Sequence, residues 1–148
     1  MQIRRAGPED IEKILPLFNA YRAFYKQEAS PEKARAFLLE NLALERSIIF
    51  FAYDNSEKPV GFIQLYPRVS SLSMTPYIYI SDLFVDPDYR RLGIARKLMQ
   101  AAHDYAIALG ASSIQLETAH TNTTAQELYE SLGYEHDQEY RTYYLGLS

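Results

Sequence analysis

A basic turn at residues 83–98, where an apolar strand pattern passes into a helix pattern, is the part of the chain best suited to bind an anion. A helix N-terminus presents unpaired backbone N–H groups and the positive end of the helix dipole, which suit a phosphate or pyrophosphate. Gly93 and Ala95 leave room for a ligand to approach the backbone. The turn matches neither GxxxxGK(S/T) nor GxGxxG, and an ordinary helix start with solvated charges is the alternative. Its positive charges come from Arg90, Arg91, Arg96 and Lys97.

Asp82 is a second candidate for chemistry, because it is a carboxylate inside the apolar strand expected over residues 77–85. Strand interiors disfavour Asp, so its presence calls for a reason. It can act as a general base, or it can be a structural carboxylate whose hydrogen bonds are satisfied, and the sequence leaves both open. Glu117, on the strand expected over residues 113–118, is a weaker alternative.

Apolar residues at three- and four-residue spacings predict the helices that must position these groups. Pro16 lies inside the first helical pattern and is expected to kink or end it. The expected helix boundaries are Pro8 for the first helix, Ser30 with Pro31 for the second, Ile94 and Gly110 for the third, and Asn122 and Gly133 for the last.

Runs of β-branched and aromatic residues between turn signals predict the strands. The element order β-α-α-β-β-β-α-β-α-β-β indicates a mixed α/β architecture. The expected strands are residues 1–5, 47–53, 60–66, 77–85 and 113–118, followed by a β-rich tail with alternation over residues 140–145.

Composition narrows the classes of function. A chain of 148 residues with 47% hydrophobic and 23% charged residues predicts one domain, residues 1–148. A formal net charge of −4 disfavours nucleic acid as a partner. The absence of Cys excludes disulfides, thiolate zinc sites and a catalytic cysteine, and the three His share no metal-ligand spacing, so no metal is expected. Without a signal-peptide pattern or an apolar run of ~20 residues, we expect a cytoplasmic protein with no membrane partner.

Two motifs resemble those of the GCN5-related N-acetyltransferase (GNAT) family. RRLGIA at residues 90–95 is similar to the family signature Arg/Gln-x-x-Gly-x-Gly/Ala, and NTTAQELYESLGY at residues 122–134 is similar to its Asn-x-x-Ala…Leu-Tyr-Glu-x-Leu-Gly-Phe/Tyr segment. The motifs stand in the family's order, so the resemblance covers essentially the whole chain. It implies the GNAT fold, a central, mostly antiparallel mixed sheet flanked by helices. Arg91 is a departure, because many members have glycine there.

The resemblance also implies acetyl-CoA as co-substrate. Backbone amides from Arg91 to Arg96 would bind its pyrophosphate, and the backbone of Phe84 and Val85 would pair with its pantetheine arm. Asn122 would contact pantetheine, although a helix N-cap alone also explains it. The implied cofactor-binding set is Phe84, Val85, Arg90, Arg91, Leu92, Gly93, Ile94, Ala95, Arg96, Asn122 and Tyr129.

Tyr129 is the candidate acid, since the matching family tyrosine protonates the departing thiolate. An unperturbed tyrosine hydroxyl, with a pKa of about 10, is protonated at neutral pH and can donate. A core aromatic is the alternative for Tyr129. Asp82 is the candidate base for the amine, and Tyr21 and Tyr25 are candidates for an aromatic acceptor slot, although as a helical stripe they also fit a core.

The leading hypothesis is therefore an enzyme that transfers acetyl from acetyl-CoA to a primary amine by direct attack in a ternary complex. The acceptor is a polyamine, an amino acid, an aminoglycoside or a basic peptide, and a link to the small histone/polyamine acetyltransferase branch is the finer hypothesis. The alternatives are an acyl-CoA-binding sensor or partner module without turnover, and a nucleotide binder using the same turn. The β-rich tail would offer an edge through which two copies could form a homodimer.

Overall fold

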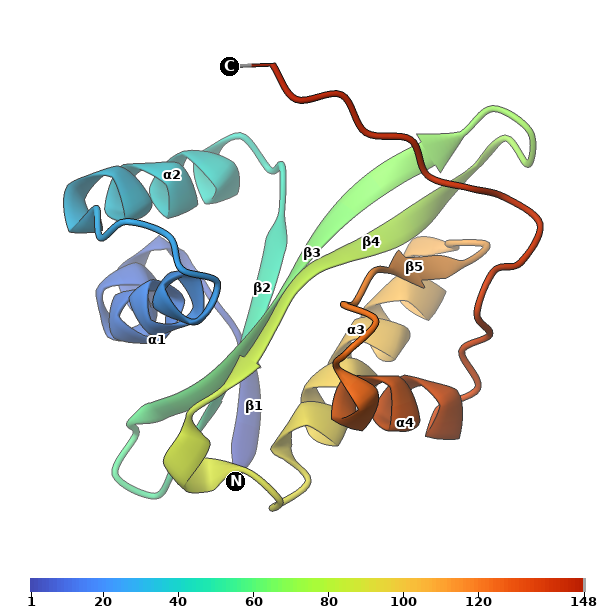
Figure 1. Ribbon diagram of the computed structural model, residues 1–148. Helices are drawn as coiled ribbons and strands as arrows, with labels where there is room; N and C mark the ends of the chain where they lie inside the picture. Colours follow the sequence, from blue (N-terminus) through green and yellow to red (C-terminus); the bar gives the residue numbers. More distant parts are fainter. Residues whose placement is uncertain (148) are drawn as a thin grey trace. The chain divides into compact units, whose positions relative to one another are not determined.

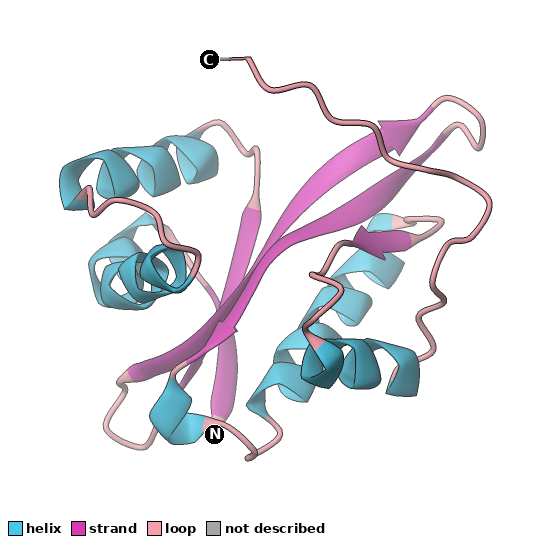
Figure 2. Ribbon diagram, viewed as in Figure 1, coloured by secondary structure: helices cyan, strands magenta, loops and turns pink. Residues whose placement is uncertain are grey.

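The computed structural model describes residues 1–147 and is shown in Figures 1 and 2. It divides into two compact units, Met1–Glu117 and Thr118–Ser148, and each is described by itself. The first unit contains the sheet and the helices α1, α2 and α3. The second contains α4 and the C-terminal segment.

The sheet of the first unit has five strands in the spatial order β1-β2-β3-β4-β5. Neighbours from β1 to β4 are antiparallel, and β5 joins β4 in parallel. The expected mixed, mostly antiparallel sheet is therefore confirmed. β3 and β4 are longer than the sequence predicts, because their pairing continues out to Ser70 and Thr75. The strands are β1 Gln2–Arg5, β2 Ile48–Tyr53, β3 Pro59–Ser70, β4 Thr75–Val85 and β5 Ile114–Leu116.

Two helices cover one face of the sheet, as Figure 1 shows. α1 (Ile11–Phe24) and α2 (Pro31–Ala43) share a buried core with the sheet side chains Phe62 and Phe84. Phe18 of α1 packs edge-on against Phe62, with ring centroids 6.1 Å apart. This aromatic core holds α1 and α2 against β3 and β4.

The opposite face is covered by α3 (Ile94–Leu109). Gly61 of β3 allows the close approach, because a Cβ there would lie 3.3 Å from both Ile94 Cγ2 and Leu98 Cδ1. Gly110 ends α3 in the left-handed conformation with φ 79°, as its position in the sequence predicts. The N-terminus of α3 is thereby fixed at the end of β4.

The start of α1 differs from the sequence prediction. Residues Pro8–Asp10 form a 3-10 turn, and α1 then continues through Pro16 to Phe24. Of the two alternatives for Pro16, the end of the helix is wrong, because buried residues on both sides of it pack into the same core, and the kink stays a prediction. Ser30 is the N-cap of α2 as predicted, but its side chain makes no capping hydrogen bond.

In the second unit, α4 spans Thr123–Ser131. Asn122 Oδ1 accepts a hydrogen bond from Ala125 N at 3.2 Å, which confirms the predicted N-cap. The predicted β-rich tail is wrong, because residues 135–147 form no strand. A strand needs a hydrogen-bonding neighbour, and in the described part of this unit no other strand supplies one.

Candidate active site

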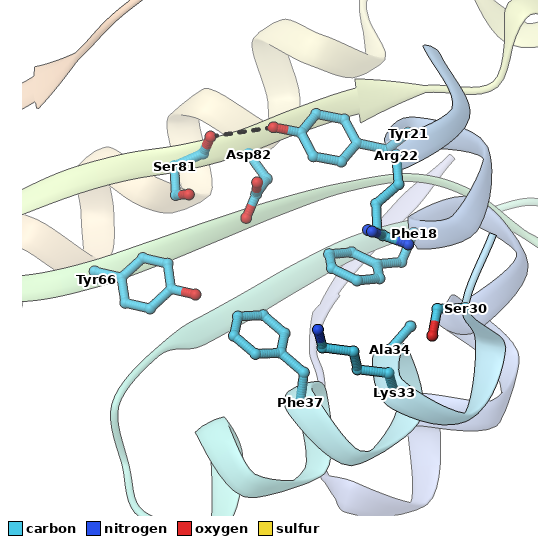
Figure 3. A pocket seen from close by; sticks show the side chains of 10 residues that line it. All are labelled: Phe18, Tyr21, Arg22, Ser30, Lys33, Ala34, Phe37, Tyr66, Ser81 and Asp82. Carbon is cyan, nitrogen blue, oxygen red and sulfur yellow. Dashed lines mark hydrogen bonds between the residues drawn. The ribbon is translucent and has the colours of Figure 1, made fainter. Parts of the chain in front are cut away.

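A pocket of about 330 Å³ lies in the first unit, where α1 and α2 face β3 and β4 (Figure 3). Ligand pockets typically measure ~300–1,000 Å³, so this one suits a small molecule. The pocket brings together Tyr21 and Asp82, two residues that the sequence predicts for the acceptor site. Its lining includes Phe18, Tyr21, Ala34, Phe37, Tyr66 and Asp82.

A chain of buried hydrogen bonds holds the Asp82 carboxylate. Gln64 Nε2 donates to Asp82 Oδ2 at 2.6 Å, and Asp82 is only 9% exposed. Gln64 is fully buried, and its Oε1 accepts from Ser47 Oγ at 2.8 Å and from Asn41 Nδ2 at 3.4 Å. Because the Gln64 amide is bound at both ends, its orientation is fixed, and so is the carboxylate oxygen that it contacts.

Sequence reasoning missed Gln64 and Asn41. A signal was present for Gln64, which is a polar residue within the apolar run of residues 60–65, as Asp82 is within its own strand. The register of the sheet places Gln64 directly opposite Asp82. Asn41 gave no such signal, because its role depends on where α2 docks.

A β-bulge sets the direction of the groups beside Asp82. Asp82 pairs with Gln64 and Ile80 pairs with Leu65, which leaves Ser81 as the extra residue on β4. The Tyr21 hydroxyl donates to the carbonyl oxygen of Ser81 at 3.3 Å (Figure 3). It also faces the Asp82 carboxylate, and its single proton can go to either acceptor.

Burial raises the pKa of Asp82 above that of an ordinary Asp, against the lowering effect of hydrogen bonds from Gln64, Tyr21 and Ser81. A carboxyl whose pKa moves towards neutrality is a stronger base when ionised. The pKa of Tyr21 is also raised, mainly by burial and secondly by the negative charge of Asp82. Its hydroxyl therefore stays protonated. The pocket therefore presents one proton acceptor beside a hydroxyl that retains its proton.

The other candidates for the acceptor and base do not line this pocket. Tyr25 is 53% exposed and packs edge-on against Tyr21, with ring centroids 5.2 Å apart. Glu117 accepts a hydrogen bond from the Tyr79 hydroxyl at 3.3 Å. Glu117 is exposed, whereas Asp82 is buried and opens into the pocket, which favours Asp82 as the base.

Beyond Ile80, the edge of β4 that faces β5 has no strand paired to it in the described residues. β5 pairs with β4 only over Ile78–Ile80, while β4 continues to Val85. Arg90 Nε donates to the Val85 carbonyl at 3.0 Å, and its guanidinium lies 5.6 Å from the Phe84 ring centroid. Arg90 thus ties the end of β4 to the turn that follows.

That turn is shaped by two left-handed residues before α3. Arg91 has φ 65° and Gly93 has φ 78°. A Cβ at Gly93 would meet no protein atom within 4 Å, so space is left beside the backbone there. The first backbone hydrogen bond of the helix runs from Lys97 N to Gly93 O at 3.1 Å, and the amides of Ile94 and Ala95 precede it. Arg91 has a positive φ, which glycine adopts without strain. This explains why many family members have glycine at this position.

In the second unit, the motif residues Asn122 and Tyr129 both belong to α4 and its cap. Asn122 is partly buried and serves as the N-cap. Tyr129 is partly buried, with its ring centroid 6.0 Å from that of Tyr134. Their predicted contacts with the co-substrate stay predictions.

Within residues 1–147, no helix has both the length and the apolar character needed to cross a membrane. Over the same residues, no three His, Cys, Asp or Glu side chains gather as a metal site would require.

The sequence model of the Acetyltransferase (GNAT) family matches residues 14–134 of this chain. An uncharacterized N-acetyltransferase of Bacillus subtilis (strain 168), YhfO, is 44% identical over 99% of this chain and 98% of its own. A probable acetyltransferase of Haemophilus influenzae is 34% identical over 100% of this chain and 99% of its own. The crystal structure of a probable acetyltransferase, 36% identical, superposes with a TM-score of 0.95 over 100% of this chain and 99% of that one. The chain therefore belongs to the GNAT family and is an acyl-CoA-dependent acetyltransferase.

Proposed function

We propose that this acetyltransferase transfers the acetyl group directly to a primary amine, within a ternary complex, with the amine bound in the pocket beside Asp82. The observation that carries the proposal is Asp82 itself, a buried carboxylate held by Gln64 and open to a small pocket. As the amine N–C bond forms, the thioester C–S bond breaks. An acceptor that arrives as an ammonium loses two protons: one before the attack, released to solvent, and one as the amide forms, which balances the proton taken up by the sulfur.

The residues of the turn fit acetyl-CoA, which as a thioester supplies the activated acetyl group. Gly93 leaves space beside a left-handed backbone, and the amides of Ile94 and Ala95 precede the first hydrogen bond of α3. Such amides and the helix dipole suit a pyrophosphate. Arg91 and Arg96 add positive charge at the same helix end. Leu92, 63% exposed, contributes its backbone to the turn.

The open edge of β4 fits the pantetheine arm. Backbone groups from Phe84 and Val85 lie beyond the stretch that β5 pairs, and amides of the arm would satisfy them. The Val85 carbonyl already accepts from Arg90, so its second lone pair remains for a ligand. This supports Phe84 and Val85 as binding residues for the co-substrate.

On the acceptor side, Asp82 removes a proton from the incoming ammonium, directly or through a water molecule. Only the neutral amine is nucleophilic, so the raised pKa of Asp82 favours this step near neutral pH. Tyr21 retains its proton, which it donates to the Ser81 carbonyl or to Asp82. Tyr129 is the proposed donor of the proton that the sulfur takes up.

Acceptors named for more distant relatives are amines too. Two proteins 26% identical to this chain, from Saccharomyces cerevisiae and Acinetobacter genomosp. 13, are named for D-amino acids and for aminoglycosides. The family match over residues 14–134 spans parts of both units, and we propose that residues 1–148 act as one acetyltransferase domain.

The proposal is tested by measuring thiol release from acetyl-CoA over a panel of amines, with Tyr129→Phe beside the wild type. We expect release that requires an amine and equals the acetylated amine formed. Tyr129→Phe should lower kcat while sparing acetyl-CoA affinity. Acetyl-CoA binding without thiol release over the panel would instead identify a sensor or partner module.

A further inference from the structure

The acceptor pocket contains two cations in addition to Asp82, and they come from the helices rather than the sheet. Arg22 on α1 and Lys33 on α2 both line it, while Ser81 and Asp82 line it from β4. Figure 3 shows the two basic side chains on the helix wall of the pocket and the carboxylate on the sheet wall. The pocket therefore has one acidic and one basic side.

Arg22 is held in place by the loop that follows its helix. Its Nη1 donates to the carbonyl oxygen of Glu28 at 2.9 Å. A guanidinium has five N–H donors in a fixed fork, so most of them remain for another acceptor. Arg22 is also only partly exposed, which strengthens its interaction with an anion.

Lys33 reaches the same pocket from the first turn of α2. Within residues 1–147, neither Lys33 nor Arg22 forms an ion pair with a carboxylate. Arg35, two residues along, contrasts with them because it pairs with both Glu12 and Glu32. The basic wall of the pocket is thus not neutralised by the described part of the chain.

Ser30 adds a hydroxyl at the same wall. It lines the pocket at the N-cap of α2, and its side chain makes no capping hydrogen bond. The positive end of the α2 dipole adds to the two side-chain charges in this place. Phe18, Ala34 and Phe37 supply apolar walls between the basic and acidic sides.

We propose that the acceptor is a small amine that also carries a carboxylate, an amino acid or a close analogue, with its ammonium at Asp82 and its carboxylate at Arg22 and Lys33. The proposal rests on the proposed function and names the substrate class of that same site. A charge-assisted contact to each end would orient the nitrogen. The apolar walls would take the side chain.

The same arrangement disfavours a polyamine, although the net charge of −4 over the whole chain points the other way. A polycation would place its second ammonium near Arg22 and Lys33, where like charges repel. The local charges at the pocket decide binding, because the exposed charges elsewhere are screened over about 10 Å. A preference for spermidine in the test below would therefore indicate a polyamine acceptor instead.

The experiment compares matched acceptors in the thiol-release assay. Each L- or D-amino acid is paired with its own amide and its own decarboxylated amine, and spermidine is included. We expect kcat/KM to be at least about tenfold higher for the carboxylate member of the preferred pair, the size of one charge-assisted hydrogen bond. Equal or better activity with the amide, the decarboxylated amine or spermidine would overturn the proposal.

The variants Arg22→Gln and Lys33→Gln test the two cations separately. If one variant protein does not fold, the other still tests the proposal. We expect each to raise KM for the carboxylate acceptor, by roughly tenfold for Arg22→Gln and less for exposed Lys33→Gln. The KM for the matched decarboxylated amine should not rise, because that acceptor has no carboxylate to lose a partner, and the KM for acetyl-CoA should not change. Lys13→Gln, an exposed lysine on α1 outside the pocket, is the control and should change none of these values.

Failure of this inference is distinct from failure of the proposed function. Thiol release that requires amines but ignores their carboxylates, in the wild type and in both variants, overturns the substrate class and leaves the acetyltransfer to amines intact. No amine-dependent release with any acceptor overturns both. A preference for carboxylates that Arg22→Gln and Lys33→Gln leave unchanged also overturns the assignment of the basic wall.

Discussion

The turn before α3 presents backbone groups, whereas the pocket beside Asp82 is lined by side chains. In the turn, the left-handed φ of Arg91 and Gly93 and the start of α3 place backbone amides around an open space. In the pocket, α1, α2, β3 and β4 contribute the side chains, and a buried hydrogen-bond chain through Gln64 orients Asp82. The first region depends on backbone conformation, and the second depends on packing between distant elements.

This difference has consequences for how each region responds to change. A backbone site tolerates many side chains but not a bulky or charged group where glycine leaves space. A site made of buried side chains is sensitive to any residue whose loss leaves a neighbour without its hydrogen-bond partner. Substitutions should therefore separate acetyl-CoA binding from turnover of the amine.

The largest effect is expected for Gly93→Glu. A carboxylate beside a bound pyrophosphate costs several kcal/mol, so acetyl-CoA affinity should fall by roughly 100-fold or more. Calorimetric titration with acetyl-CoA measures this. Gly110→Glu is the matched control, because Gly110 has φ 79° and equally open surroundings at the other end of α3. Similar losses of affinity in both variants would show that strain rather than the site is responsible.

Asp82→Asn should lower kcat by roughly 100-fold, the usual contribution of a general base, and spare acetyl-CoA affinity. The rise of kcat/KM with pH that reports Asp82 should lie above the ordinary Asp range in the wild type and vanish in the variant. Asp104→Asn, at an exposed carboxylate on α3, is the control. A pH profile shared by wild type and Asp82→Asn would leave Asp82 with a structural role.

The same variant should be more stable than the wild type at neutral pH. Because burial raises the folded-state pKa of Asp82, its contribution to stability is full below the ordinary Asp pKa and is lost as pH rises through the folded value. The gain in melting temperature of Asp82→Asn should thus shrink as the pH falls from the raised folded-state pKa towards the ordinary Asp pKa, and be absent below about 4. A gain that is constant with pH would contradict this origin.

Gln64→Leu tests whether the pocket relies on its hydrogen-bond chain. Loss of the Gln64 amide removes the hydrogen bond that Ser47 Oγ donates to it and one of the hydrogen bonds that Asp82 accepts, so unfolding free energy should fall by about 1–3 kcal/mol. The kinetic pKa assigned to Asp82 should rise, because the lost bond favoured the ionised form. Gln115→Leu, at an exposed glutamine on β5, is the control. Unchanged kinetics in a stable Gln64→Leu protein would remove Gln64 as a positioning residue.

The smallest effect is expected for Arg91→Gly. Relief of a left-handed φ at a non-glycine residue should raise unfolding free energy by about 0.5–1 kcal/mol. Loss of the positive charge should weaken acetyl-CoA binding a few-fold. Glu57→Gly relieves a φ of 64° in a turn elsewhere, and it should stabilise without changing acetyl-CoA affinity. Denaturant titration with and without acetyl-CoA separates the two effects.

The turn could be predicted from the sequence because its geometry is local. Gly93, its basic neighbours and the change from strand to helix all lie within a few residues of one another. The helix caps at Gly110 and Asn122 could be predicted for the same reason, because each depends only on neighbouring residues. Asp82 was predicted because a carboxylate interrupts an apolar strand. The tail strands were predicted wrongly, because alternation over residues 140–145 indicates strand propensity but supplies no partner strand.

The pocket could be predicted only in part. Tyr21 was named for it, whereas Arg22, Lys33 and Asn41 became visible only when α1 and α2 were placed on the sheet. Their roles depend on contacts between residues far apart in the chain, which no local spacing encodes. That α1 continues past Pro16 depends on tertiary packing in the same way, since buried residues on both sides of it hold the helix.

The most direct measurement is amine-dependent thiol release by the wild type, Gly93→Glu and Asp82→Asn under the same conditions, together with acetyl-CoA titrations of all three. We expect release by the wild type only when an amine is present, loss of acetyl-CoA binding in Gly93→Glu, and intact binding with roughly 100-fold slower release in Asp82→Asn. Release that does not require an amine, or full activity in Asp82→Asn, would contradict it.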